Sequence, residues 1–314
     1  MSQTPFTVSA DIDLGGRVEP YRKASGYDVR IEAGSVPETL GSTATKRASY
    51  EVAPGRFLMR VPNGLIFYVE DGSRVTYQQP SNVTDREVML FLLGSAWGAL
   101  CYQRNLLPIH ASGIIHHGNV YAFTGPSGAG KSTLCAALSH RGHPFFADDV
   151  LVIDPNTLST DPVCYAGQKD LKLWSDALAL TNAKKKTPVR EAEGFEKFYA
   201  NPAVFAESTK GYLRQLYLLT SLNDKVDGEP ITVAPIKGVV SARKLLDAVY
   251  RRVFANDIVG QKMLFEWLAK LIQHVDVYRF DRPMNRSQFD DGVDFMSDRI
   301  FSLARGETQT THDG

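Results

Sequence analysis

The chain carries, from residue 125 to residue 132, the stretch Gly125-Pro126-Ser127-Gly128-Ala129-Gly130-Lys131-Ser132. This stretch matches the pattern G-x-x-x-x-G-K-[ST] at every fixed position. With glycine at about 7% of residues, a chance match in a chain of this length is on the order of one in a hundred. An apolar run at residues 120–124 precedes the stretch, and an apolar-periodic segment at residues 132–141 follows it. The sequence therefore predicts a strand, a glycine-rich loop and a helix, in that order.

The fixed residues of this loop suit the binding of phosphate. Glycines allow backbone N–H groups to close around phosphate oxygens, and the N-terminus of the following helix adds partial positive charge. Lys131 brings a full charge to the β- and γ-phosphates, and the Ser132 hydroxyl is a ligand for magnesium. We therefore expect ATP and Mg2+ as cofactors. The expected cofactor-binding residues are Gly125, Ser127, Gly128, Ala129, Gly130, Lys131, Ser132 and Thr133.

Two adjacent carboxylates, Asp148 and Asp149, follow a short apolar run. Paired carboxylates at the end of a buried strand are unfavourable unless a metal ion or a proton compensates them. One short helix and one short strand should return the chain to the loop, where a magnesium nucleotide would compensate the pair. We expect Asp148 to be the general base and Asp149 to bind the metal together with Ser132, although the two carboxylates can exchange these roles. The alternative is a solvated turn without catalytic function.

The region before the loop has a different pattern. Apolar residues alternate in three short runs between residues 57 and 77, and the turn signals Asn63-Gly64 and Asp71-Gly72 separate these runs. This pattern is typical of an antiparallel meander. Residues 88–102 are apolar but fewer than the roughly 20 that a membrane span needs, so we expect a buried helix there. The sequence predicts an α/β protein with a β-rich N-terminal domain at residues 1–100, a P-loop domain at 101–305 and a disordered tail at 306–314.

The composition argues against several classes of protein. Lysine plus arginine and aspartate plus glutamate each number 35, so the formal net charge is zero. This balance gives no reason to expect binding to nucleic acid or to a membrane. The N-terminus lacks the basic and apolar segments of a secretory signal, and the three cysteines match no metal-ligand spacing. We expect a cytoplasmic protein with idle thiols.

The segment from the loop to the carboxylate pair resembles the catalytic domain of HPr kinase/phosphorylase. The similarity covers residues 105–155, continues weakly through 171–178 and 212–219, and includes His110, which matches an active-site histidine of that family. The resemblance implies an HPr-kinase-like P-loop fold and phosphotransfer from ATP to a serine. It also implies that His110 bonds the catalytic aspartate or the transferring phosphate. The motifs that carry the resemblance are residues 125–132, Ile109-His110-Ala111-Ser112-Gly113, Arg141-Gly142-His143 and Ala147-Asp148-Asp149, and the catalytic residues it implies are Asp148, Asp149, His110 and Lys131.

Three departures from that family narrow the expected activity. Thr133 and Val150 stand where the family has glutamate and arginine, and its signature for dephosphorylation is missing from the sequence. The pattern is more similar to stand-alone HPr-kinase-like proteins, some of which phosphorylate the C-terminal serine of lasso-peptide precursors. We therefore expect a serine kinase without phosphorylase activity, acting on a small protein or precursor peptide. The sequence leaves open whether the protein forms a homo-oligomer.

Two other functions are compatible with the same motifs. A small-metabolite kinase on this fold would need an enclosed acceptor pocket. A non-enzymatic ATP sensor would use nucleotide binding to set a conformation. The intact pair Asp148-Asp149 favours an enzyme over a sensor.

Replacement of Lys131 by alanine removes the charge that is expected to meet the phosphates. Because a hydrogen bond to a charged group contributes about 1.5–3 kcal/mol, we expect the affinity for Mg-ATP to fall roughly tenfold or more. Phosphotransfer should stop while circular dichroism shows an intact fold. Calorimetric titration measures the affinity, and wild-type affinity in the variant would contradict the assignment of the loop.

Overall fold

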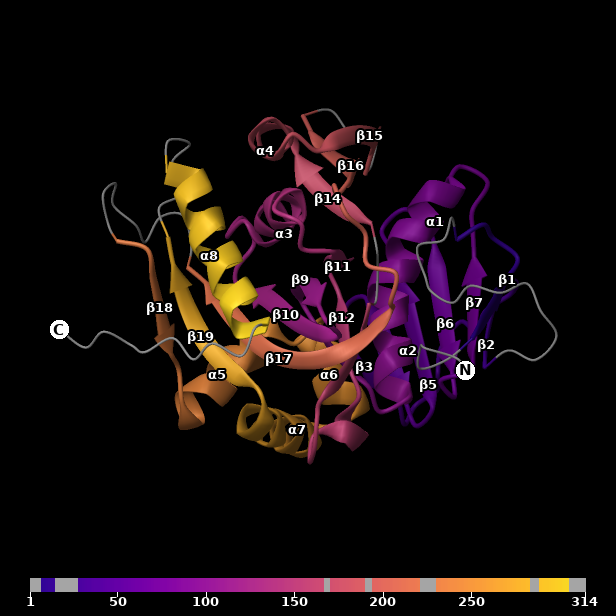
Figure 1. The fold of residues 1–314 in the computed structure, drawn as a ribbon. Coiled ribbons are helices and arrows are strands. Elements are labelled where there is room, and N and C mark those ends of the chain that lie inside the picture. The colour runs from indigo at the N-terminus through magenta and orange to yellow at the C-terminus, as the bar shows by residue number, and fades with distance from the viewer. Residues whose placement is uncertain are drawn as a thin grey trace.

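The computed structural model describes residues 7–14, 28–166, 170–189, 194–220, 230–282 and 288–304. In this part of the chain an N-terminal sheet and a P-loop sheet are joined by a helical segment, and a small third sheet lies above the P-loop domain (Figure 1). The fold class expected from the sequence is confirmed: a β-rich N-terminal region precedes an α/β region that contains the P-loop. The expected tail at 306–314 lies outside the described residues.

The N-terminal sheet contains β1 (Val8–Ala10), β2 (Val29–Ala33), β3 (Thr45–Lys46), β4 (Tyr50–Ala53), β5 (Arg56–Arg60), β6 (Ile66–Glu70) and β7 (Arg74–Gln78). Its strand order is β1-β2-β7-β6-β5-β4-β3. The expected meander is confirmed, since β5, β6 and β7 pair with antiparallel neighbours. By contrast, β2 pairs in parallel with both β1 and β7. Alternate residues of β6 and β7 are buried, which places one face of the sheet on the core.

The expected buried helix consists of α1 (Asp85–Phe91), a π-helical turn η1 (Leu92–Ala96) and α2 (Trp97–Gln103). Thr84 caps this segment: its hydroxyl accepts from the Glu87 N–H, and the Glu87 carboxylate accepts from the Thr84 N–H. The helix α2 spans the boundary between residues 100 and 101 that the sequence suggested. The division of the chain into domains at that position therefore stays a prediction.

The P-loop sheet contains β8 (Leu107–Ile109), β9 (Ala111–His116), β10 (Asn119–Thr124), β11 (Phe145–Ala147), β12 (Leu151–Ile153), β13 (Val163–Ala166), β17 (Lys210–Leu219), β18 (Thr232–Pro235) and β19 (Asp276–Asp281). The main strand order is β11-β9-β10-β17-β13-β12-β8, and β19 pairs with β17 and β18. Both β10 and β19 run parallel to β17. Their carboxyl ends therefore meet at one edge, where ligands bind in open α/β sheets.

Helices cover both faces of this sheet (Figure 1). One face carries α3 (Lys131–His140) and α8 (Phe289–Ala304), and the other carries α5 (Gly238–Ala248), α6 (Arg252–Ile258) and α7 (Gln261–His274). The strand β10 feeds both cores, because Tyr121 and Phe123 belong to the first and Val120 and Ala122 to the second. The third sheet, near α3 in Figure 1, has the strand order β14-β16-β15 and consists of β14 (Leu171–Trp174), β15 (Lys184–Pro188) and β16 (Lys197–Asn201). The helix α4 (Ser175–Thr181) follows β14, and a 3-10 turn η2 spans Pro155–Thr157.

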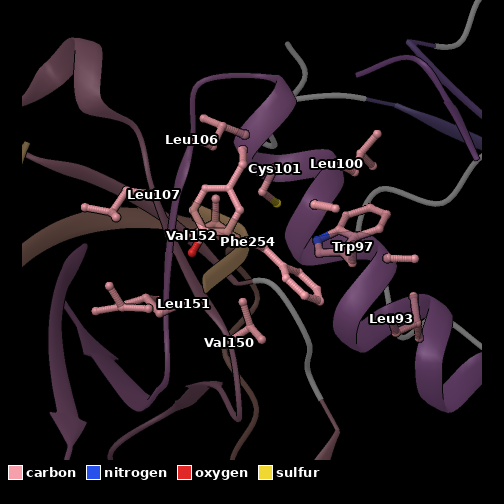
Figure 2. Close-up of a cluster of buried hydrophobic side chains, with 14 of the residues drawn as sticks. Leu93, Trp97, Leu100, Cys101, Leu106, Leu107, Val150, Leu151, Val152 and Phe254 are labelled. Atoms are coloured by element: carbon pink, nitrogen blue, oxygen red, sulfur yellow. The ribbon is translucent and has the colours of Figure 1, made fainter. Parts of the chain in front are cut away.

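The helical segment packs directly against the P-loop domain. Figure 2 shows its buried side chains beside those of Val150, β12 and α6; among the labelled residues are Leu93, Trp97, Leu100, Cys101, Leu151, Val152 and Phe254. The N-terminal sheet reaches the same place, because the Tyr50 and Phe254 rings lie 4.6 Å apart and the Tyr50 hydroxyl donates to Asp257 at 2.7 Å. One hydrophobic core thus runs from the N-terminal sheet to the strand that follows Asp149.

Replacement of Leu100 by alanine should lower the free energy of unfolding by about 2–5 kcal/mol, because Leu100 is fully buried in this shared core. We expect one cooperative transition in both the wild type and the variant. Urea titration followed by tryptophan fluorescence and by far-ultraviolet circular dichroism measures both quantities. Two separated transitions would show that the N-terminal sheet unfolds independently of the P-loop domain.

Candidate functional site

The loop between β10 and α3 has the backbone that a phosphate cradle requires. Gly125, Gly128 and Gly130 have φ values of 143°, 83° and 80°, a region that glycine reaches without strain. A Cβ atom at Gly125 would lie 2.6 Å from the Leu219 carbonyl oxygen on the neighbouring strand. At Gly128 no atom of the described residues lies within 4 Å of such an atom, so the described structure leaves the loop open on that side.

The side chain of Lys131 folds back onto the loop that precedes it. Its Nζ donates to the carbonyl oxygens of Gly125 at 2.9 Å and Pro126 at 3.0 Å. Lys131 is 7% exposed, and burial lowers its pKa while the charges of Asp148 and Asp149 oppose that shift. A bound phosphate would give the buried ammonium group of Lys131 an anionic partner.

The carboxylate of Asp148 faces this loop and is fully engaged. Its Oδ1 accepts from the hydroxyls of Ser112 and, at 2.7 Å, Ser132, and its Oδ2 accepts from the Lys172 backbone N–H at 3.0 Å. Only 2% of Asp148 is exposed. The arrangement fixes one carboxylate oxygen beside the serine hydroxyl that ends the loop motif, and oxygen pairs of this kind suit magnesium.

The side chain of Asp149 points away from that of Asp148, because the backbone turns sharply between the two residues. Asp149 has a φ of 70°, which is uncommon for a residue with a side chain, and the Val150 N–H closes the turn onto the Asp148 carbonyl at 2.8 Å. Its carboxylate is 31% exposed and lies 3.2 Å from the Lys172 Nζ. Burial alone would raise the pKa of Asp149, but the hydrogen bond from His110 and the charge of Lys172 hold it well below its usual range.

The ring of His110 is held against this turn. Its Nδ1 lies 2.8 Å from the Asp149 carbonyl oxygen and 3.3 Å from Oδ1 of the same residue. Because a carbonyl oxygen can only accept, Nδ1 carries a proton and, in the neutral ring, Nε2 is an acceptor. The His110 backbone is also fixed, since its N–H donates to Ala248 and its carbonyl accepts from the Thr124 hydroxyl.

Sequence reasoning did not assign two residues of this cluster. Ser112 is the second residue of β9, and its place two residues after His110 is the signal in the sequence that could have identified it. Lys172 is the second residue of β14 and follows a polar stretch of sequence, and nothing in its spacing points to the carboxylates. Burial lowers the pKa of Lys172, but the nearby charge of Asp149 outweighs it, and the pKa is raised overall.

Two cavities meet at His110. The first, of about 750 Å³, is lined by the loop, by the carboxylate pair and by residues of β14 and α4. The second, of about 370 Å³, lies at the carboxyl ends of β10 and β17 and extends to α5. Both volumes are in the range of ligand sites. Of the residues expected from the sequence, Ser127, Gly128, Gly130, Lys131, Ser132, Thr133, Asp148, Asp149 and His110 line the first cavity, Gly125 and His110 line the second, and Ala129 is buried behind the loop.

The motif Arg141-Gly142-His143 does not reach either cavity. His143 is fully buried beneath α8, where its ring lies 4.2 Å from that of Phe301 and its Nε2 lies 2.9 Å from the Ser297 hydroxyl. Arg141 pairs with Asp290 and Asp294 on the same helix. This motif therefore attaches α8 to the end of α3.

Comparison with models of protein families assigns the chain to a family of P-loop proteins. The family model described as ABC transporter matches residues 110–285, which is more than half of the chain. The chain belongs to this family of P-loop proteins. A search of curated proteins found no match.

Solved structures also match the chain. One of them is the HPr(Ser) kinase/phosphatase from Coxiella burnetii, with 12% sequence identity and a TM-score of 0.31, over 62% of this chain and 98% of that chain. Within the described residues, no helix is long and apolar enough to cross a membrane.

Replacement of His143 by glutamine should remove a pH dependence of stability. Burial and the charge of His116 lower the pKa of His143 from 6.5 to about 4, so the folded state takes up its proton less readily than the unfolded state. Stability should therefore decline in the wild type as pH falls from 6.5 to 4, by about 3 kcal/mol from this group.

The glutamine variant keeps a polar partner for Ser297 but cannot titrate, so its decline over the same pH range should be smaller by that amount. Urea unfolding at pH 7, 5.5 and 4 measures the difference. Parallel pH profiles of the two proteins would contradict the lowered pKa of His143.

Proposed function

We propose that this chain is an ATP-dependent kinase that transfers the γ-phosphoryl group to a serine hydroxyl of a small protein or peptide. Its membership of a P-loop family supports nucleotide binding. The observation that carries the proposal is the separation of the two adjacent carboxylates: Asp148 bonds Ser132 of the loop, and Asp149 lies beside His110, where the two cavities meet. A nucleotide sensor has no need of a partly exposed carboxylate beside a second cavity.

The residues of the first cavity suit ATP and Mg2+. The open loop and the buried ammonium of Lys131 fit the phosphates, and the paired oxygens of Ser132 and Asp148 fit a magnesium ion. Magnesium, when bound, screens the charge of the phosphates. Lys131 would contribute its own charge at the transferring group.

The geometry favours the exchanged roles of the two carboxylates. Asp148 was expected to be the base, but donors occupy both of its oxygens and it is almost fully buried. Asp149 is the more exposed of the pair and adjoins the second cavity through His110. With a lowered pKa it stays ionised at neutral pH, so it would orient the acceptor hydroxyl and take its proton late in the transfer.

The second cavity is the proposed entry for the acceptor. Leu218, Leu219 and Ile236 give it an apolar wall, and its charged lining residues are Lys244, Arg279 and Asp247. At about 370 Å³ it has room for one or two side chains of a peptide segment. A serine on an exposed segment could therefore reach Asp149, and a small hydroxylated metabolite is the alternative acceptor.

The two carboxylates should respond differently to replacement by asparagine. With Asp149→Asn we expect Mg-ATP to bind normally and transfer to fall by roughly 10²–10⁴, the range of general-base catalysis, at every magnesium concentration. Asparagine tolerates the positive φ of this turn, so the change isolates the charge. With Asp148→Asn the magnesium requirement should rise, and excess magnesium should partly restore transfer.

Labelled ATP, with single-serine peptides and free L-serine as acceptors, measures transfer, and a serine-free peptide is the control. Transfer to L-serine alone would identify a metabolite kinase. A folded wild type that binds Mg-ATP but labels no acceptor would contradict the proposed kinase. Equal and mild losses in both variants would instead contradict the assigned roles of the carboxylates.

A further inference from the structure

A buried arginine lies behind the phosphate-binding loop. Arg282 follows β19 directly, is only 2% exposed and is among the largest fully buried side chains of the described chain. Within the described residues no carboxylate pairs with it, and its Nε has no hydrogen-bond partner. Burial lowers the pKa of Arg282 to about 10, so the side chain still carries its charge at neutral pH.

The guanidinium of Arg282 lies 5.3 Å from the centre of the Phe280 ring, and its polar contacts are made with the loop backbone. Its Nη2 lies 3.4 Å from the Ala129 carbonyl oxygen and 3.5 Å from the Gly130 carbonyl oxygen. These distances are long for hydrogen bonds, so the attraction is mainly electrostatic. The guanidinium thus attracts two successive carbonyl groups.

The direction of these carbonyls has a consequence for the opposite side of the loop. In a planar trans peptide the C=O and the N–H point in opposite directions. A carbonyl of Ala129 turned toward Arg282 directs the Gly130 N–H away from it, and the Gly130 carbonyl does the same for the Lys131 N–H. These are N–H groups of the loop motif, and a nearby cation also polarises the peptide groups that carry them.

The helix α8 leaves room for this side chain. Gly292 lies inside α8, where glycine costs roughly 1 kcal/mol relative to alanine. A Cβ atom there would lie 3.2 Å from Cδ of Arg282. A small residue in the helix therefore accommodates the arginine stem.

We infer that Arg282 is a positioning residue for phosphate binding: it orients and polarises the peptide groups of residues 129–131 from behind the loop. A buried cation without a carboxylate partner, as Arg282 is among the described residues, is costly for the fold, and a nucleotide in the loop would supply negative charge. The inference rests on the proposed nucleotide binding and requires nothing of the acceptor. A failure of phosphotransfer would leave it standing, and its own failure would leave the kinase proposal standing.

Arg282→Met keeps the bulk of the side chain and removes its charge. We expect the Kd of Mg-ATP and of magnesium pyrophosphate to rise at least tenfold in calorimetric titrations. The Tm without ligand should be unchanged or higher, because the variant no longer buries a charge that lacks a carboxylate partner among the described residues. Arg282→Lys retains a charge and should lose less affinity than the methionine variant.

Arg141→Met is the matched control, since Arg141 also joins α3 to α8 but at the far end of α3. The Kd of Mg-ATP for the Arg141→Met variant should equal that of the wild type. A folded Arg282→Met protein with a Kd within twofold of the wild type would overturn the inference, as would an equal loss of affinity in the control. If Arg282→Met does not fold, Gly292→Ala decides: a severalfold rise in Kd supports the inference, and an unchanged Kd overturns it.

Discussion

The structure depends on the buried carboxylate of Asp148. It accepts hydrogen bonds from three segments that are distant in the sequence: the Ser112 hydroxyl of β9, the Ser132 hydroxyl of α3 and the Lys172 backbone N–H of β14. A carboxylate with this little exposure is stable only when its oxygens are occupied by donors. One side chain therefore attaches the central sheet, the phosphate-binding helix and the small third sheet to a common point.

Charged side chains surround the Asp148 carboxylate on several sides. Asp149 contacts Lys172 and His110 on the exposed side, Lys131 lies within the loop, and Arg282 lies behind it. The cations Lys131, Lys172 and Arg282 thus outnumber the carboxylates Asp148 and Asp149. The excess is due to Arg282, because no carboxylate in the described residues pairs with it. A site with excess buried positive charge favours a polyanion. This is the electrostatic condition that a triphosphate would satisfy.

The sequence predicted the parts of this site that follow one another along the chain. The glycines, Lys131 and Ser132 could be assigned because a strand, a loop and a helix fix their relations locally. The different surroundings of Asp148 and Asp149 could not be predicted, because they follow from a positive φ at Asp149 that sends adjacent side chains in different directions. Lys172 and Arg282 were missed for another reason: both reach the site through tertiary packing and belong to no motif. The helix α8, which makes room for Arg282, also carries no sequence signal that we recognised.

The departure from the HPr kinase pattern at Val150 has a physical explanation in the fold. Val150 is 1% exposed and shares a hydrophobic core with Trp97 and Leu100 of the helical segment (Figure 2). An arginine at this position would bury a charge among apolar side chains. The strained turn at Asp149 is therefore held on one side by the hydrogen bond from His110 and on the other by the hydrophobic core that Val150 shares with α2. Because strained backbone persists only where its surroundings determine it, the N-terminal region takes part in setting the position of the proposed catalytic carboxylate.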